Sequence, residues 1–169
     1  TLQEMDADIE ITNVRDQSGE PVGYITFRHG PLIGADIPAA RAPSMIDEYP
    51  IAAMAAAVAF GETRFRGLAE LRVKESDRFA AIVDGLVACG VPARADGDDI
   101  VVTGQGGPPP GGAEVHVNLD HRIAMAYLVL GLASAKPVTI DDAAAIETSF
   151  PGFLELMTGL GADIAPVGD

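Results

Sequence analysis

The 169-residue sequence has no tryptophan, a single cysteine and few aromatic residues. One cysteine cannot form an internal disulfide, which excludes a small disulfide-stabilised scaffold and fits a reducing compartment, the cytoplasm. Aromatic residues make up 5% of the chain and hydrophobic residues 48%. The core must therefore consist of alanine, valine, leucine, isoleucine and methionine, and we expect Cys89 to be buried among them.

Basic residues are also scarce, with 11 lysines and arginines against 25 acidic residues and a net charge of −14. An acidic surface repels nucleic-acid backbones and anionic lipid headgroups, so neither nucleic acid nor a membrane is an expected partner. No apolar run reaches the length of a membrane span. Because cations are rare, each place where they gather is informative.

Motifs for cofactors and metals are missing as well. The sequence has no cysteine and histidine spacing typical of zinc, no dinucleotide fingerprint and no nucleophile elbow, so we expect no metal and no cofactor. The glycine-rich stretch Gly104–Gly112 is followed by neither a lysine with serine or threonine nor a helix. We interpret it as the tip of a hairpin and not as a phosphate-binding loop.

Hydrophobic periodicity predicts strands and helices in alternation. Two loops are expected at Pro43–Pro50 and Asp141–Ser149, Gly61 is expected to end the first long helix, and a strand is expected to begin at Gly161–Ile164. The predicted helices are Ile51–Phe60, Asp77–Cys89, His121–Ser134 and Phe150–Leu160. The predicted strands are Asp8–Val14, Val22–Phe27, Ala35–Ala39, Thr63–Val73, Val115–Leu119 and Lys136–Ile140, with a hairpin at Ala93–Thr103.

The predicted elements repeat along the chain. Helices end in similar joints at Asp6, Gly90 and Gly161, which are 84 and 71 residues apart. Two almost wholly apolar helices each lead into a strand, a loop and a second helix, which indicates an α+β fold of repeated βαβαββ-like units. An apolar helix cannot be covered by one unit alone, so several units must pack their inner helices together with the sheets outside. The chain holds about two units with flanking pieces, and we expect it to begin within a longer protein.

The stretch Leu71–Ala80 combines apolar flanks with five charged residues. It is predicted to end a strand, turn, and start a helix capped by Ser76 or Asp77. Arg78 would then lie at the positive end of the helix dipole, which disfavours a cation by some tenths of a kcal/mol (about 0.3–1). A bound anion would reverse this cost. The alternative is that Arg78 pairs with Glu75 or Asp77 on a solvated surface.

Arg122 repeats this peculiarity at the start of the second apolar helix. If the repeated units pack together, their equivalent loops come to one end of the domain. Lys74, Arg78 and Arg122 would then surround an anion, while Asp47 and Glu75 supply carboxylates for proton transfer. The residues leave an alternative open, in which Asp47 and Asp120 cap helices and the arginines pair with them.

Four segments resemble the C-terminal part of the EPSP synthase (3-phosphoshikimate 1-carboxyvinyltransferase) family. They are RAPSMIDEYP (Arg41–Pro50), LRVKESDR (Leu71–Arg78), LDHRIAM (Leu119–Met125) and TSFPGF (Thr148–Phe153). The first and fourth are most similar to the bacterial class that is often tolerant of glyphosate. The resemblance implies two domains of three βαβαββ units, an inverse α/β barrel. Residues 1–169 would be the C-terminal portion, the N-terminal domain would be absent, and the full-length protein would be a monomer.

The resemblance also implies roles for individual residues in transferring the enolpyruvyl group of phosphoenolpyruvate to the 5-hydroxyl of shikimate 3-phosphate. Asp47 matches an aspartate that binds the shikimate hydroxyl and is a candidate base. Lys74 matches a lysine that contacts shikimate 3-phosphate, and Glu75 a carboxyl group implicated in proton transfer at the phosphoenolpyruvate methylene. Arg78 and Arg122 match the arginines that hold phosphoenolpyruvate.

The chain departs from the family pattern at two positions. Thr148 stands where many members have a lysine, and Glu70 where some have an asparagine. Two other functions are alternatives. One is a related UDP-N-acetylglucosamine enolpyruvyl transferase, and the other is a non-catalytic domain that binds an anion or a partner. Without its N-terminal domain the chain is expected to be inactive.

Overall fold

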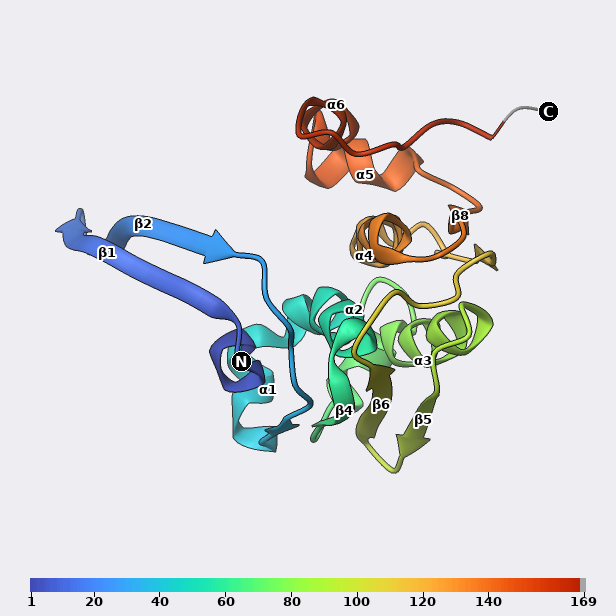
Figure 1. The fold of residues 1–169 in the computed structure, drawn as a ribbon, viewed down its shortest axis with the longest axis horizontal. Helices are drawn as coiled ribbons and strands as arrows, with labels where there is room; N and C mark the ends of the chain where they lie inside the picture. Colours follow the sequence, from blue (N-terminus) through green and yellow to red (C-terminus); the bar gives the residue numbers. More distant parts are fainter. Residues whose placement is uncertain (168–169) are drawn as a thin grey trace.

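The computed structural model describes residues 1–167 and confirms the mixed α+β class (Figure 1). The strands are β1 Asp8–Gln17, β2 Glu20–Arg28, β3 Asp36–Ile37, β4 Phe60–Phe65, β5 Ala93–Asp96, β6 Asp99–Gln105, β7 Glu114–Val115 and β8 Thr139–Ile140. The helices are α1 Ala42–Met45, α2 Tyr49–Val58, α3 Arg78–Ala88, α4 His121–Ala133, α5 Ala144–Ser149 and α6 Phe153–Gly159. Short 3₁₀ turns cover Leu2–Met5, Ala39–Arg41, Ile46–Glu48 and Ala69–Val73.

The middle of the chain forms a four-stranded sheet in the order β3-β4-β6-β5, parallel between β3 and β4 and antiparallel elsewhere. The predicted hairpin is present as β5 and β6, which turn at Gly97 with a positive φ of 62°. Helix α2 packs on β6 and helix α3 on β5, so both helices cover one side of the sheet (Figure 1). We call residues 32–105 the middle unit.

The C-terminal unit, residues 110–167, is built on the parallel pair β7 and β8. Its apolar helix α4 packs against α2, and α5 packs on the other side of α4, so Figure 1 shows the helices stacked in layers above the sheet. Buried Tyr127 of α4 donates its hydroxyl to the carbonyls of Ala81 (3.0 Å) and Ile82 (2.8 Å) in α3. Within residues 1–167, no helix combines the length and the apolar character needed to cross a bilayer.

The three predicted joints share one backbone geometry. Asp6, Gly90 and Gly161 all have positive φ, of 67°, 77° and 95°. The residue after each donates its N–H to the carbonyl five positions earlier, as from Val91 to Leu86 (2.9 Å). This pattern is a Schellman motif, which ends a helix with a left-handed residue.

The parallel strand pairs of the two units also match. Arg64 donates its N–H to the carbonyl of Ala35 at 2.9 Å, and Thr139 donates to Ala113 at 2.9 Å. Each pair is extended by one isolated parallel bridge, Ile33 with Phe60 and Gly111 with Lys136. The strands β3 and β4 therefore correspond to β7 and β8.

Several predicted boundaries are wrong because backbone pairing and tertiary contacts override the local pattern. Helix α2 begins at Tyr49, so the segment predicted as a loop at Pro43–Pro50 is largely helical. Gly61 does not end this helix; it lies inside β4 with φ of 96°, since Phe60 already donates to the carbonyl of Leu32. Strand β4 stops at Phe65, and Leu71 and Val73 belong to a 3₁₀ turn instead of a strand.

The C-terminal half contains further corrections. Gly104–Gly112 is not a hairpin tip, because it connects β6 to β7, which belongs to a different sheet. The carbonyls of Pro109 and Pro110 accept the N–H groups of Ala135 and Lys136, which fixes this connection against the C-terminal unit. The loop expected at Asp141–Ser149 contains α5. The strand expected to begin at Gly161–Ile164 is not present: Gly161 lies in a turn with φ of 95°, and residues 162–164 belong to no strand among the described residues.

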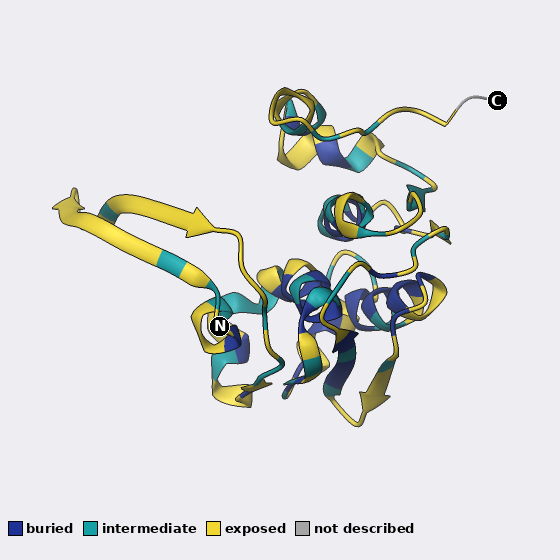
Figure 2. Ribbon diagram, in the orientation of Figure 1, coloured by how far each residue is buried: buried dark blue, intermediate teal, exposed yellow. Residues whose placement is uncertain are grey.

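Strands β1 and β2 form a separate hairpin that projects from the rest of the molecule, as Figure 1 shows, and Figure 2 shows that it is mostly exposed. Ile11 pairs with Ile25 and Ile9 with Phe27, so these side chains share one face. Ile11, Ile25 and Phe27 are 55–64% exposed. A two-stranded ribbon is marginally stable alone, and its apolar face therefore needs a covering element.

Candidate functional site

The helices α2, α3 and α4 begin close to one another, as the repeat predicted. Their starting segments bring six charged side chains together, and we call this group the helix-start cluster. It consists of Asp47, Lys74, Glu75, Arg78, Asp120 and Arg122.

Arg78, the first residue of α3, lies at the centre of the cluster with its side chain fully buried. Its Nε donates to Asp120 Oδ2 at 2.7 Å, and its Nη1 donates to Asp47 Oδ1 at 2.9 Å. Its Nη2 lies 2.6 Å from Glu75 Oε2. The pairing with Glu75 was one expected alternative, but the solvated surface expected with it is wrong. Asp77 caps the helix by accepting the N–H of Ala80.

The third guanidinium nitrogen of Arg78 is poorly satisfied. Although Nη2 is close to Glu75, the contact lacks hydrogen-bond alignment, and no other described residue accepts from this buried nitrogen. The Glu75 carboxylate compensates the charge of this nitrogen without an aligned hydrogen bond. A better aligned anionic oxygen would add such a bond, worth about 1.5–3 kcal/mol for a bond to a charged group.

Asp120 holds two helix starts together. As N-cap of α4 its Oδ1 accepts the N–H groups of Arg122 (3.0 Å) and Ile123 (3.4 Å). Its Oδ2 accepts from Arg78 and from the Ser76 hydroxyl at 2.9 Å. Burial opposes ionisation of this carboxyl, but the hydrogen bonds from Arg78 and Ser76 outweigh it and hold the pKa of Asp120 below its ordinary value.

The sequence alternative in which Asp120 caps a helix and also pairs with an arginine matches these contacts, and the arginine is Arg78. A capping aspartate uses one carboxylate oxygen for the helix and keeps the other available. The signal was therefore present in the position of Asp120 directly before a helix that starts with Arg122. Ser76, one of the two predicted caps of α3, does not cap this helix and donates its hydroxyl to Asp120.

Asp47 is surrounded by cations. Besides Arg78, Lys74 Nζ lies 3.9 Å from its Oδ1 and Arg122 Nη2 lies 3.7 Å from its Oδ2. Arg122 Nη1 also donates to the Asp47 carbonyl at 3.0 Å. Asp47 does not cap α2, since Glu48 occupies the N-cap position and makes no side-chain bond there.

The members of the cluster differ in their exposure to solvent. The side chains of Asp47 (40% exposed), Glu75 (57%) and Arg122 (35%) face solvent, whereas Arg78 and Asp120 do not. Lys74 Nζ lies 2.8 Å from Glu70 Oε1, and the hydrogen bond that it donates to Glu70 raises the pKa of Lys74. The accessible groups are of both signs, which suits a ligand that is anionic and also exchanges protons.

The five predicted site residues therefore lie together, although their substrate roles stay predictions. The open alternative, in which the arginines pair with Asp47 and Asp120, describes the ion pairs that are present. Thr148, which stands where many family members have a lysine, donates its hydroxyl to the Ala145 carbonyl within α5.

Comparisons with known proteins point to one family. The family model described as EPSP synthase (3-phosphoshikimate 1-carboxyvinyltransferase) matches residues 1–157. A 3-phosphoshikimate 1-carboxyvinyltransferase of Rhodospirillum rubrum is 63% identical over 165 residues, which are 98% of this chain and 37% of that protein. A protein of the same name from Granulibacter bethesdensis is 61% identical over 165 residues, 98% of this chain and 36% of that protein.

Solved structures agree with the sequence comparisons. An EPSP synthase from Acinetobacter baumannii superposes with a TM-score of 0.91 at 38% identity, covering 97% of this chain and 38% of that chain. An enolpyruvyl transferase from Streptomyces tendae, at 22% identity and a TM-score of 0.66 over 97% of this chain and 34% of that chain, shares the fold. The chain thus spans about 37% of the length of the curated relatives it matches.

Proposed function

The chain belongs to the EPSP synthase family, and from this premise we propose that it is part of an enzyme of the shikimate pathway. The proposed reaction transfers the enolpyruvyl group of phosphoenolpyruvate to the 5-hydroxyl of shikimate 3-phosphate and releases phosphate. The helix-start cluster would supply part of the site. The remainder would come from the polypeptide that the relatives have beyond this length.

The observation that carries the proposal is the buried Arg78 with its unaligned Nη2 at the meeting point of three helix starts. Glu75 is the most exposed partner of Arg78 and the one without a proper hydrogen bond, so it is the partner that a ligand can replace most easily. An oxygen of phosphoenolpyruvate in its place would be held by Arg78 from the interior and by Arg122 from the solvent side. Helix N-termini favour the same negative charge.

The carboxylates fit the proton transfers of an addition–elimination reaction. In the addition, the substrate hydroxyl loses its proton and attacks the central carbon of phosphoenolpyruvate, while the methylene carbon gains a proton. Elimination of phosphate from the tetrahedral intermediate takes a proton from the resulting methyl group and restores the double bond. Asp47 is the proposed base at the hydroxyl, and Glu75 is the proposed group at the methylene carbon.

Displacing Glu75 from Arg78 would link binding to chemistry. If phosphoenolpyruvate takes the place of Glu75 on Nη2, Glu75 becomes free to exchange a proton with the ligand that displaced it. Lys74, kept cationic by Glu70 and Asp47, is the proposed contact to shikimate 3-phosphate.

The proposal also includes the location, the oligomeric state and the glyphosate class of the full-length enzyme. A cytoplasmic location is proposed, supported by the lone free Cys89, which is buried in the core. A monomeric full-length enzyme is proposed from the family resemblance alone. The amino-acid sequences of the segments Arg41–Pro50 and Thr148–Phe153 support membership in the bacterial class that is often tolerant of glyphosate. A domain that only binds an anion is the second candidate. It is favoured by the ion pairs of the cluster, which would also be expected in a site that binds a ligand without catalysing a reaction.

Phosphate release by the full-length protein with both substrates tests the proposal. We expect turnover, and we expect Arg122→Gln to lower kcat/KM by about 100-fold or more, as for loss of one charge-stabilising group. Arg94→Gln is the control, because Arg94 pairs with Glu62 on the exposed sheet surface. Binding of phosphoenolpyruvate without phosphate release would favour the second candidate, and an Arg122→Gln enzyme equal to the parent would contradict the assigned site.

A further inference from the structure

The turn that leads into α4 contains two residues in an unusual backbone conformation. Asn118 and Leu119 both have positive φ, of 51° and 57°. The turn is closed by the Asp120 N–H, which donates to the Val117 carbonyl at 2.9 Å. Positive φ at both central residues is typical of a type I′ turn, which favours glycine, asparagine and aspartate. Leu119 is therefore held in a conformation that a leucine rarely adopts, because its Cβ crowds the backbone there.

The side chain of Leu119 does not explain this strain. Leu119 is 67% exposed, so its burial contributes little that would offset the strained backbone. Strain persists where the surrounding structure fixes it, and such places gather where function depends on geometry. The turn directly precedes Asp120, whose carboxylate binds Arg78 and caps α4. A contact that fixes the turn therefore also fixes the position of that carboxylate.

Asp141, which follows strand β8, binds the first residue of the turn. Its Oδ1 accepts the Val117 N–H at 2.9 Å, and its Oδ2 lies 3.0 Å from Nδ1 of His116. Its own N–H donates to the Val115 carbonyl at 3.2 Å. The hydrogen bond from the Val117 N–H lowers the pKa of Asp141, which keeps the carboxylate ionised and a strong acceptor. Because Val117 is fully buried, solvent is a poor substitute for this acceptor.

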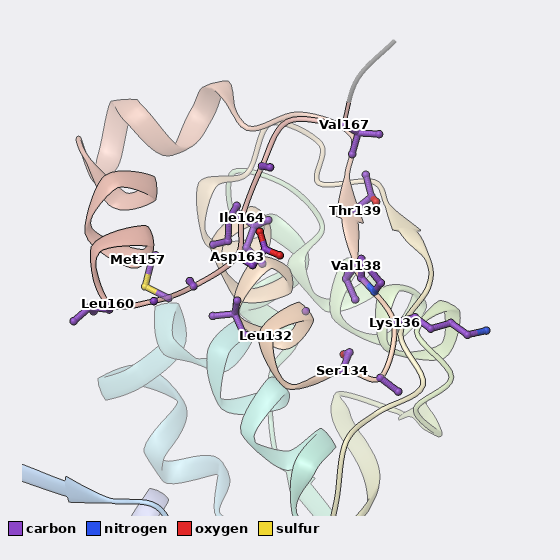
Figure 3. Close-up of a pocket in the computed structure, with 17 residues that line it drawn as sticks. Leu132, Ser134, Lys136, Val138, Thr139, Met157, Leu160, Asp163, Ile164 and Val167 are labelled. Carbon is purple, nitrogen blue, oxygen red and sulfur yellow. The ribbon is translucent and has the colours of Figure 1, made fainter.

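Strand β8 connects this contact to the rest of the C-terminal unit. Thr139 of β8 lines a cleft of about 760 Å³ together with Leu132 of α4 and residues that follow α6 (Figure 3). The pairing of β7 with β8 covers only two residues of each strand, and the Asp141 carboxylate extends this link to the turn. The turn is thus held from both sides, by Asp141 before it and by Arg78 and Ser76 after it.

We propose that Asp141 is a positioning residue of the helix-start cluster. By binding Val117 it keeps the turn closed, and the closed turn places the Asp120 carboxylate against Arg78. Without this contact, Leu119 relaxes toward negative φ, and the N-cap carboxylate moves away from the guanidinium.

The two proposed substrates depend on the turn to different degrees. Arg78 and Arg122, the proposed contacts to phosphoenolpyruvate, are both bound by the Asp120 carboxylate, the first through its guanidinium and the second through its N–H. Lys74, the proposed contact to shikimate 3-phosphate, lies on the segment before α3 and pairs with other carboxylates. The expected selectivity rests on the proposed function, whereas the contact of Asp141 with the turn does not.

Steady-state kinetics of the full-length protein tests the selectivity. Asp141→Ala removes the acceptor and Asp141→Asn keeps an oxygen in its place. Asp142→Ala is the matched control, because the Asp142 carboxylate accepts the Ala144 N–H at the start of α5. We expect Asp141→Ala to raise the KM for phosphoenolpyruvate by about 10-fold or more and that for shikimate 3-phosphate by less than about two-fold, with Asp141→Asn and the control close to the parent. Equal effects on both substrates, or of both alanine variants, would overturn the positioning role.

A second-site substitution tests the strain. Glycine adopts positive φ readily, and asparagine followed by glycine is a preferred pair for a type I′ turn. In the Asp141→Ala background, Leu119→Gly should therefore return the KM for phosphoenolpyruvate to within about three-fold of the parent value. Absence of any recovery would contradict the claim that Asp141 acts by holding a strained turn.

Amide hydrogen exchange separates this inference from the proposed function. In the full-length protein without substrates, the amides of Val117, Asp120 and Arg122 should exchange about 10-fold faster or more in Asp141→Ala than in Asp142→Ala. Equal exchange in the two variants would overturn the positioning role, whatever the protein catalyses. Faster exchange in Asp141→Ala, combined with a parent protein that neither binds phosphoenolpyruvate nor releases phosphate, would refute the proposed function and support the contact of Asp141 with the turn.

Discussion

Replacing Asp120 with asparagine tests whether the buried ion pair with Arg78 holds the two units together. Asparagine has nearly the same size and remains a good N-cap, so the change removes charge while keeping the start of α4. Both Arg78 and Asp120 are fully buried, and their closest atoms are 2.7 Å apart. The variant leaves a buried cation with a weaker partner.

The expected cost follows from the surroundings of Arg78. Removing one partner of a buried pair typically costs about 3–5 kcal/mol in the free energy of unfolding. Asp47 and Glu75 remain beside the guanidinium and compensate part of its charge. We therefore expect Asp120→Asn to destabilise the 169-residue chain by about 3 kcal/mol, near the lower limit of that range.

Urea unfolding followed by circular dichroism measures this difference at neutral pH. The matched control is Asp77→Asn, the same chemical change at the N-cap of α3, where the side chain accepts the N–H of Ala80 and is exposed. The control should cost less than about 0.5 kcal/mol. Equal costs for the two variants would refute the claim that the buried pair, and not the cap, carries the energy.

The pH dependence gives a second criterion. The pKa of Asp120 is lower in the folded protein than its unfolded value of about 3.9. Its contribution to stability is therefore complete well above pH 4 and is lost as the pH falls through the folded pKa. The gap between the parent and Asp120→Asn should narrow below about pH 4, and a gap that stays constant down to pH 2 would contradict the assignment.

Three further predictions concern activity and packing. In the full-length protein, Glu75→Gln should lower turnover by orders of magnitude while calorimetry shows shikimate 3-phosphate binding largely unchanged; near-normal turnover would remove Glu75 from the proton transfer. The 169-residue chain alone should release no phosphate in a colorimetric assay with both substrates, and measurable release would mean that it contains a complete site. Gly85→Ala should cost about 1–3 kcal/mol in urea unfolding, because a Cβ would lie 2.3 Å from Tyr127 Oη, and an unchanged midpoint would disprove that contact.

The sequence predicted the parts of the fold that depend on local periodicity. Helices α3 and α4 and the β5–β6 hairpin lie where the pattern placed them, because their apolar spacing and turn residues agree. The joints at Asp6, Gly90 and Gly161 were recognisable, because a left-handed residue ends each helix. The Gly61 prediction was wrong because a glycine can adopt a positive φ both at the end of a helix and inside a strand. The sequence alone does not distinguish the two cases, whereas the pairing of β4 with β6 does.

The sequence predicted which residues belong to the candidate site, but it did not predict the contacts between them. A cation in the first turn of a helix is costly in isolation, which singled out Arg78 and Arg122. The sequence could not show that Asp120, 42 residues away from Arg78, would bind it, because that contact depends on how α4 docks against α3. For the same reason, the sequence could not show whether the ion pairs of Arg78 lie on the surface or in the interior, because their burial depends on how the units pack.

The helix-start cluster also depends on the packing of the two units against each other. Its contacts join residues 31, 42 and 75 positions apart, so it forms only after α2, α3 and α4 have come together. Contacts of such long range close long loops, and they are lost when one unit detaches from the other. A substitution at the α2–α4 packing surface, far from any charged group, would thus separate the charged side chains of the cluster, and with them the proposed binding site, while most secondary structure remains. Conversely, a ligand that binds the cluster would hold the units in their docked state.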